Sequence, residues 1–170
     1  MARPVLPDVL RHGLAVVFVG TAAGDRSAKE GAYYAHPGNK FWRTLHAVGL
    51  TDRVLKPAEF GEAPGYGIGF TDLCKTQSGR DHAIDDYDVP GFERKMRRFA
   101  PGAVAFTSKT GAATWRGVTT AALRYGLQPQ RLDFPPVFVL PSPSGAAAGH
   151  WQIEPWYELA RWLAKRHESG

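Results

Sequence analysis

The sequence predicts an α/β fold in which helices cover a parallel sheet. Four short apolar runs are bounded by Gly, Pro or Ser, as is typical of strands buried on both faces; they cover residues 16–20, 67–72, 103–107 and 137–140. Segments whose apolar residues recur at helical spacing lie between these runs and after the last one. Strands that alternate with helices favour a layered parallel sheet with right-handed crossovers.

Four helices are expected from their caps and their apolar spacing. Asn39 is a suitable N-cap for the first helix. The second helix begins at residues 90–92, and Ser108 caps a third helix that extends towards Tyr125. The last helix begins near residues 154–155, where a proline is favourable because its missing N–H is not needed in the first turn.

The composition is that of one soluble domain spanning residues 1–170. No apolar run approaches the roughly 20 residues that span a bilayer, and the N-terminus lacks the apolar centre of a signal peptide. A cytoplasmic location is therefore expected. Cys74 is the single cysteine, which excludes a disulfide within the chain and a four-cysteine zinc or iron–sulfur site, and we expect it to be buried.

The net charge leaves several classes of partner open, and missing motifs argue against others. A formal net charge of +5 suits nucleic acid, an anionic small molecule or an acidic partner. The basic run at residues 94–98 is typical of the exposed face of a helix, and His82 with its neighbouring aspartates is typical of a polar loop. The group of His82 with Asp81, Asp85 and Asp86 is a weak exception among clusters that otherwise lack metal-ligand spacing. The GxxxxGK[ST] loop and the full dinucleotide fingerprint are both missing, which argues against ATP, GTP and NAD.

Small and polar residues follow each predicted strand. They occupy residues 20–24, 71–72, 107–109 and 141–145. Because ligands bind beyond the carboxyl ends of the strands in open α/β sheets, we expect these segments to meet in one cleft.

Four side chains near this cleft are candidates for chemistry or binding. Asp72 ends an apolar run, so it either caps the following turn or serves as a catalytic carboxylate. Asp25 follows Gly24 directly and is either a cap or surface residue or a second catalytic candidate. His36 is a general base, a ligand or a structural histidine. Tyr34 either packs in the core or offers a face on which a planar base can stack.

Three segments together indicate a family. Residues 20–24 read Gly-Thr-Ala-Ala-Gly, residues 34–42 read Tyr-Ala-His-Pro-Gly-Asn-Lys-Phe-Trp, and residues 140–145 read Leu-Pro-Ser-Pro-Ser-Gly. They resemble the first motif, the aromatic-Ala-His-Pro-x-Asn-x-Phe-Trp segment and the second motif of the mismatch-specific uracil-DNA glycosylases, a branch that includes the thymine-DNA glycosylases. The resemblance implies a single three-layer α/β/α domain around a short, mainly parallel sheet.

The resemblance also implies an activity and a set of site residues. The expected reaction is monofunctional hydrolysis of the N-glycosidic bond of uracil, or of another deaminated base, after the base is flipped out of DNA. It implies no cofactor or metal; the partners are the damaged DNA and its abasic product, and a monomer suffices. The residues expected to bind the base are Gly20, Thr21, Ala22, Ala23, Tyr34 and Ser108. The residues expected to bind DNA are Lys109, Ser142, Pro143, Ser144, Gly145, Ala146, Ala148 and His150.

The sequence departs from the family pattern at three places. The family usually has a catalytic Asn at the third position of the first motif, where this chain has Ala22, which cannot position water. We therefore expect Asp72 to assist the reaction, with Asp25 as the alternative. Ser142 replaces the Asn of the second motif, and residues 146–148 are alanines where relatives have a bulkier wedge and an Arg. Weak dependence on the opposite base, and acceptance of single-stranded DNA, are therefore predicted.

Two other functions stay open. The chain is a non-catalytic or very slow binder of damaged or abasic DNA if loss of the family Asn abolishes or greatly slows the reaction. It is a small hydrolase of free nucleosides if its basic charge and second-motif loop do not serve DNA. The carboxylate at Asp72 argues against a pure binder, because a negative charge near phosphates repels DNA.

Overall fold

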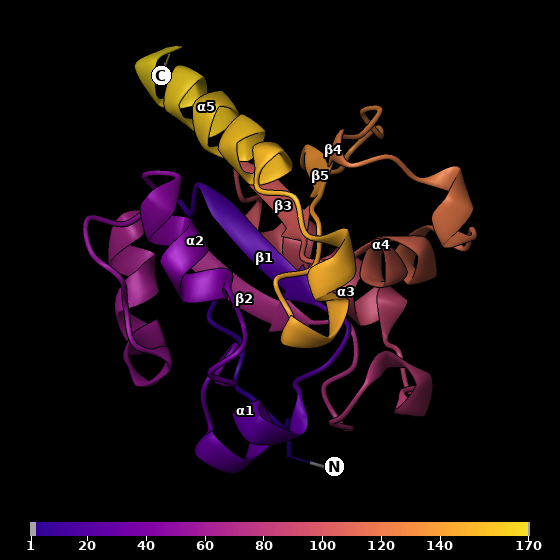
Figure 1. Cartoon of the computed structure of the whole chain (residues 1–170). Coiled ribbons are helices and arrows are strands. Elements are labelled where there is room, and N and C mark those ends of the chain that lie inside the picture. Colours follow the sequence, from indigo (N-terminus) through magenta and orange to yellow (C-terminus); the bar gives the residue numbers. More distant parts are fainter. Residues whose placement is uncertain (1–2, 170) are drawn as a thin grey trace.

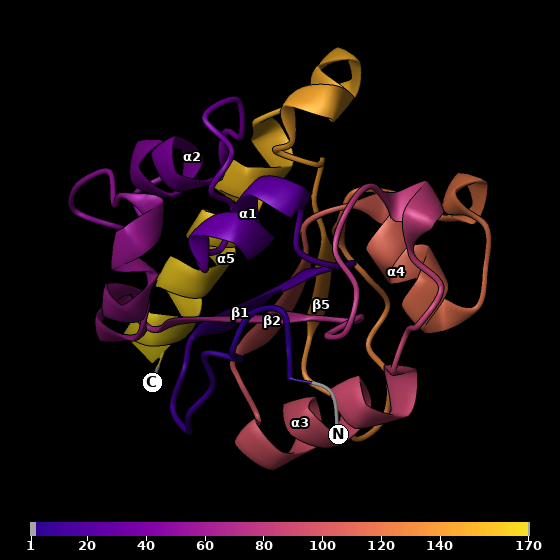
Figure 2. The same cartoon turned by 90° about the horizontal axis from the view of Figure 1, so that it is seen from below.

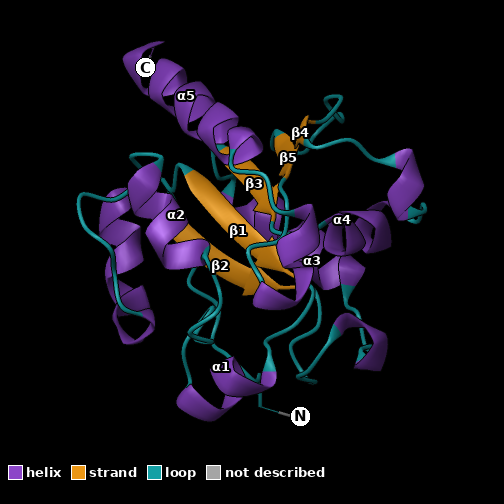
Figure 3. Cartoon of the chain, viewed as in Figure 1, coloured by secondary structure: helices purple, strands orange, loops and turns teal. Residues whose placement is uncertain are grey.

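A five-stranded sheet forms the middle layer of the protein. The computed structural model describes residues 3–169. The strands are β1 (Val16–Gly20), β2 (Ile68–Asp72), β3 (Ala103–Phe106), β4 (Gly126–Leu127) and β5 (Val137–Val139). They lie in the order β2-β1-β3-β5-β4, with every neighbouring pair parallel except β4 and β5 (Figures 1 and 3). The predicted α/β fold with a mainly parallel sheet is confirmed.

Helices cover both faces of this sheet. The α-helices are α1 (Asp25–Glu30), α2 (Phe41–Ala47), α3 (Val89–Phe99), α4 (Lys109–Arg116) and α5 (Glu154–Ser169). Short 3-10 segments occupy Pro57–Tyr66, Asp81–Ala83, Thr120–Ala122 and Gly145–His150. Figure 2 shows α2 and α5 on one side of the strands and α3 and α4 on the other, which gives the three layers.

Side chains alternate along the strands and build two cores. Phe18, Phe70 and Phe138 point to the face that α2 and α5 cover. Val19 and Phe106 point to the opposite face, where they pack with apolar residues of α3 and α4. This period of two is the geometry of any strand, and burial of both faces explains why the strands read as continuous apolar runs.

The N-terminal segment pairs with the outer side of β2. Val9 and Phe70 form an isolated antiparallel bridge in which each backbone N–H donates to the other residue's carbonyl, at 2.9 and 3.0 Å. The N–H of Val5 donates to the carbonyl of Lys75 at 2.7 Å. This pairing places Asp8, which lies between the two contacts, next to the end of β2.

Several predicted boundaries need correction. The third helix does not extend towards Tyr125: it ends at Arg116, because Gly117 adopts a left-handed conformation with φ of +71° that closes the helix. Helix α1 and strand β4 were not predicted, since α1 buries only Ser27 and β4 has two residues. Within residues 3–169, none of the helices combines the length and apolar character that crossing a membrane requires.

Candidate active site

A cavity of about 1180 Å³ opens where the parallel strands end. Each of the four segments expected to meet there contributes to its lining, together with Tyr33, Tyr34, His36 and residues 79–82. The position agrees with the general rule for open α/β sheets, in which crossovers leave a crevice beyond the carboxyl ends of the strands.

Backbone hydrogen bonds hold the two motif loops in place. The carbonyls of Thr21 and Ala23 accept from the N–H groups of Cys74 and Gly79 at 2.8 and 3.0 Å. These bonds fix the first motif against the segment that follows β2. On the opposite side, the N–H of Lys40 donates to the carbonyl of Pro143 at 2.8 Å and ties the second motif to the start of α2.

Asp72 lies in the cavity wall beside the first motif. The register of the parallel pair sets Asp72 opposite Gly20, the last residue of β1. A Cβ atom at Gly20 would lie only 2.5 Å from Asp72 Oδ1, so the carboxylate occupies space that a glycine leaves free. Asp72 is 6% exposed. Its ion-pair partner is the side chain of Lys75, three residues further along the chain.

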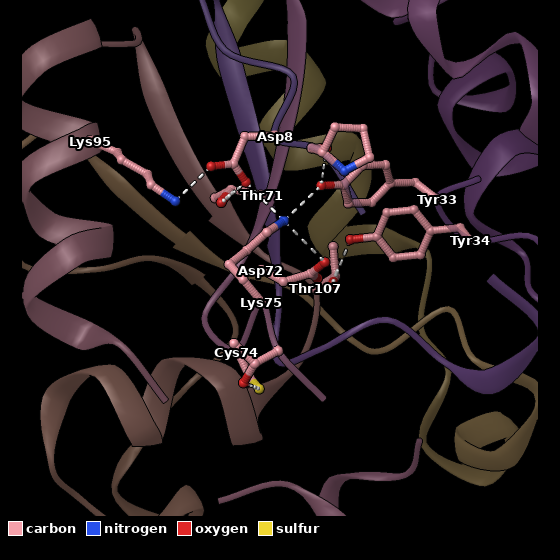
Figure 4. A network of polar contacts seen from close by, with 11 residues as sticks. Asp8, Tyr33, Tyr34, Thr71, Asp72, Cys74, Lys75, Lys95 and Thr107 are labelled. Atoms are coloured by element: carbon pink, nitrogen blue, oxygen red, sulfur yellow. Dashed lines mark hydrogen bonds and ion pairs between the residues drawn. The ribbon is translucent and has the colours of Figure 1, made fainter. Parts of the chain in front are cut away.

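Burial controls the ionisation of Asp72. Desolvation raises its pKa to about 6, with Asp8 acting in the same direction, and Lys75 and Lys95 opposing both. The Lys75 ammonium lies 3.8 Å from Asp72 Oδ2 but 2.8 Å from Asp8 Oδ1, so its charge is engaged mainly by Asp8 (Figure 4). Asp72 is therefore a carboxylate near neutral pH that readily takes up a proton, which is a property of catalytic carboxyl groups.

Tyr34 presents a half-buried ring at the cavity. Phe41 stacks against it, with ring centroids 3.9 Å apart and planes inclined by 17°. Its hydroxyl is 3.2 Å from Thr107 Oγ1 at the end of β3. Tyr34 also has a φ of +52°, a left-handed conformation that strains an aromatic residue. Tyr34 thus combines a strained backbone with a ring that is stacked on Phe41 at the cavity.

Burial and the nearby Asp72 raise the pKa of the Tyr34 hydroxyl above its ordinary value. The same two causes, in the same order, raise the pKa of the Tyr33 hydroxyl. Both phenols therefore stay protonated at neutral pH and can only donate or accept neutral hydrogen bonds.

Asp25 and His36 also line the cavity, but both are exposed. Asp25 begins helix α1, and its Oδ1 accepts from the Ser78 hydroxyl at 3.3 Å. His36 Nδ1 accepts from the backbone N–H of Gly38 at 2.9 Å, a contact within its own turn. Both placements fit the structural alternatives raised for these residues.

Most of the other expected site residues lie at the cavity as well. The lining includes Gly20, Thr21, Ala22, Ala23, Ser108, Lys109, Ser142, Pro143, Ser144, Gly145, Ala146 and His150. Ala148, an exposed residue of the 3-10 segment that follows the second motif, does not belong to it. Lys109 is held at the rim by Tyr125, whose ring centroid is 4.5 Å from its Nζ.

Asp81 is a polar group of the cavity that sequence reasoning missed as a site residue. Its Oδ1 accepts from the Thr21 hydroxyl at 2.7 Å, which connects the polar loop after β2 to the first motif. The loop's composition predicted its polarity, but not which motif it would contact, because the two residues are 60 positions apart.

The charged residues in the lining are balanced in sign. Arg26, Arg80 and Lys109 carry positive charge, and Asp25, Asp72 and Asp81 carry negative charge. Across residues 3–169, His, Cys, Asp and Glu side chains do not gather in threes in a way that could hold a metal ion.

The fold and this cavity define an α/β protein with an open cavity at the carboxyl ends of a mainly parallel sheet. The family model described as "Uracil DNA glycosylase superfamily" matches residues 7–164. The chain therefore belongs to this superfamily. Its fold is similar to a solution NMR structure from Methanosarcina acetivorans described as a "putative Uracil DNA glycosylase", with a TM-score of 0.64 and 21% identity over 95% of this chain and 98% of that one.

Proposed function

We propose that this protein is a monofunctional DNA glycosylase of base excision repair. It flips out uracil, or another deaminated base, and hydrolyses the N-glycosidic bond to leave an abasic site. The observation that carries the proposal is the buried, ionisable carboxylate of Asp72 beside the first motif in the cavity wall. Superfamily membership supports DNA glycosylase chemistry in general, and the motif resemblance points to the mismatch-specific branch.

In this proposal the flipped base lies between the first motif and Tyr34. The free face of the Tyr34 ring stacks on the base, while backbone N–H groups of residues 21–23 donate to its carbonyl oxygens. Ser108 borders the same space, and Lys109 with residues 142–146 and His150 contacts the DNA strand. Phe41 fixes the orientation of the stacking ring from behind.

Water supplies the nucleophile in the proposed reaction. Its oxygen forms a bond to C1′ of the deoxyribose as the bond from C1′ to the base nitrogen breaks. Asp72 accepts the water proton, and the base leaves with the electron pair, its charge stabilised by the first-motif N–H groups. Before protonation, the carboxylate also stabilises the positive charge that develops on the sugar. Asp72 thus takes over the role that Ala22 cannot perform.

Single-turnover excision from uracil-containing oligonucleotides tests the proposal. We expect Asp72→Asn to reduce the rate about 10²–10⁴-fold, the usual loss when a group that assists proton transfer is removed. Asp25→Asn is the matched control, because it removes an exposed carboxylate that lines the same cavity. Abasic sites are read out by alkaline strand cleavage. Loss of activity only in Asp25→Asn would move the catalytic role to that residue.

One observation favours a second candidate function, a non-catalytic or very slow binder of damaged or abasic DNA. Ala22 lines the cavity at the position where the family usually has its catalytic Asn. Tight binding of uracil-containing or abasic DNA by the wild-type protein, without excision, would support the binder and contradict the glycosylase. Release of uracil from free deoxyuridine, but not from DNA, would contradict both.

A further inference from the structure

Lys75 lies between two carboxylates, those of Asp8 and Asp72, and is much closer to the first. Its Nζ is 2.8 Å from Asp8 Oδ1 and 3.8 Å from Asp72 Oδ2, and it donates to the Tyr33 hydroxyl at 3.2 Å (Figure 4). An ammonium has three N–H groups. Two of them serve Asp8 and Tyr33 at hydrogen-bond distance, while Asp72 is held only at the longer distance.

Asp8 is fixed in this position from three sides. Its Oδ1 accepts from the Thr71 hydroxyl at 2.7 Å, and its Oδ2 is 2.6 Å from Lys95 Nζ, which belongs to α3. The bridge between Val9 and Phe70 anchors the adjoining backbone on β2. Burial by itself would raise the pKa of Asp8, but Lys75, Lys95 and Thr71 lower it, so Asp8 stays ionised.

This arrangement determines how strongly the positive charge of Lys75 acts on the Asp72 carboxylate. The charged and titratable groups that act on Asp72 or lie beside it are Asp8, Tyr33, Tyr34, Lys75 and Lys95. Of the two lysines, Lys75 is within ion-pair distance of Asp72, whereas Lys95 pairs with Asp8 and lowers the pKa of Asp72 more weakly. If Lys75 moved from Asp8 to hydrogen-bond distance of Asp72, it would lower the pKa of Asp72 further and engage the oxygen that the proposed reaction needs.

We propose that Asp8 is a positioning residue that draws the Lys75 ammonium away from the Asp72 carboxylate and so keeps that carboxylate available to the cavity. Asp8 does not contact the substrate; it acts through Lys75. Its kinetic consequence rests on the glycosylase function proposed above, whereas its effect on the ionisation of Asp72 does not.

The first test measures the ionisation of Asp72 and does not depend on enzymatic activity. The pH titration of the Asp72 carboxyl carbon is followed by carbon NMR in the full-length protein. In Asp8→Asn, which keeps the shape of the side chain and removes its charge, we expect the midpoint to fall by about one unit or more as Lys75 moves to Asp72. In Lys75→Met we expect the midpoint to rise. Lys95→Met is the matched control, because it removes the other lysine of Asp8 and leaves Lys75 in place, and its midpoint should change by less than about half a unit.

A double variant separates positioning from a general structural effect. If Asp8 acts through Lys75, Asp8→Asn will change the midpoint far less in the Lys75→Met background than in wild type. An unchanged or higher midpoint in Asp8→Asn would overturn the inference, as would an equal change in both backgrounds. Should Asp8→Asn fail to fold, Lys75→Met still decides, because a midpoint that does not rise shows that Lys75 has no influence on Asp72.

The second test is the pH profile of single-turnover uracil excision. We expect Asp8→Asn to lower the rate at pH 7 by roughly tenfold, as suits a weaker and ion-paired base, and to move the acidic limb of the profile to lower pH. A rate reduced equally at every pH, with no movement of that limb, would indicate a structural role and contradict the inference. A shifted NMR midpoint in a protein without excision activity would contradict the proposed function and leave the positioning role of Asp8 standing.

Discussion

Gly20 and Asp72 are matched residues on neighbouring strands, and the size of one sets the position of the other. The carboxylate lies where a Cβ at Gly20 would approach Oδ1 to 2.5 Å. The glycine is therefore required by its neighbour's side chain, since its own backbone conformation is extended strand. Sequence reasoning assigned Gly20 to the base-binding loop; its contact with Asp72 follows only from the register of β1 and β2.

Substitution of Gly20 tests whether the position of Asp72 matters for the proposed reaction. Gly20→Ala forces the carboxylate to move, and we expect single-turnover uracil excision to slow at least tenfold, because misplacement by about 1 Å can cost 10²-fold. Gly24→Ala is the matched control: it lies in the same loop, with nothing within 4 Å of the added Cβ. Full activity in Gly20→Ala would show that excision does not depend on this placement.

The buried carboxylate of Asp72 should also cost stability. The native state holds the proton of Asp72 up to about pH 6, whereas an unfolded Asp releases it near 3.8. The unfolded state thus binds fewer protons between these values, so stability falls as the pH rises from about 4 to 6 and the loss is constant above. Two pKa units correspond to about 3 kcal/mol.

We therefore expect Asp72→Asn to be more stable than wild type at pH 8, by about 2–3 kcal/mol in the free energy of unfolding. The difference should shrink towards zero below about pH 3, where wild-type Asp72 is protonated in both states. Urea unfolding at the two pH values measures it, with Asp25→Asn as an exposed control that should show no such change. A less stable Asp72→Asn at pH 8 would mean that its contact with Lys75 outweighs the cost of desolvation.

At the scale of elements, helix α4 begins at the cavity, and its cap was predicted from sequence. The Ser108 hydroxyl accepts from the N–H of Gly111 at 3.1 Å. We expect Ser108→Ala to lower the free energy of unfolding by about 1 kcal/mol, the usual value of a lost N-cap. Asp88→Ala is a comparison outside the cavity, because Asp88 caps α3 in the same way through Gly91 at 3.0 Å. If only Asp88→Ala is destabilised, the hydroxyl of Ser108 does not stabilise α4.

The elements that sequence reasoning found share one property, a strong apolar pattern or a clear cap. All four parallel strands were placed to within one residue at each end, because both of their faces are buried. Helix α1 lacks an apolar stripe, and β4 is too short to show a period of two. The end of α4 was misplaced because the backbone conformation of Gly117, rather than a change in apolar spacing, terminates it.

The candidate site, too, has one part that could be predicted from the sequence and another that could not. Its motif segments follow predicted strands, so their convergence could be inferred from the topology rule for parallel sheets. The contacts of Asp8 with Lys75 and Lys95, and of Asp81 with Thr21, join residues at least 60 positions apart. Such pairs leave no periodic signal in one sequence, so the ion-pair network around Asp72 became visible only in the folded chain.

At the scale of the whole molecule, the proposed function predicts that substrate preference depends on the turn that follows the second motif. Residues 145–150 form a 3-10 segment in which Ala146 and Ala148 are exposed and carry small side chains. Small side chains fill the gap left by a flipped base poorly. We expect excision rates on G:U duplex, A:U duplex and single-stranded uracil DNA to agree within about tenfold, since unstacking costs least in single strands.

A bulkier side chain at the same turn provides the matched test. Ala146→Leu adds apolar volume at an exposed position of the cavity rim. We expect it to raise the duplex rate relative to the single-strand rate. A wild-type protein that strongly prefers G:U duplex would contradict this interpretation of the turn.

The N-terminal segment has a second consequence, for self-association. Strand β2 is the outermost of the parallel strands, and a bare strand edge offers unpaired N–H and carbonyl groups to another chain. The bridge to Val9 pairs the backbone N–H and the carbonyl of Phe70. The hydrogen bond from Val5 to Lys75 keeps the N-terminal segment alongside the chain beyond the end of β2. The segment that holds Asp8 beside Asp72 therefore also shields the sheet from edge-to-edge aggregation.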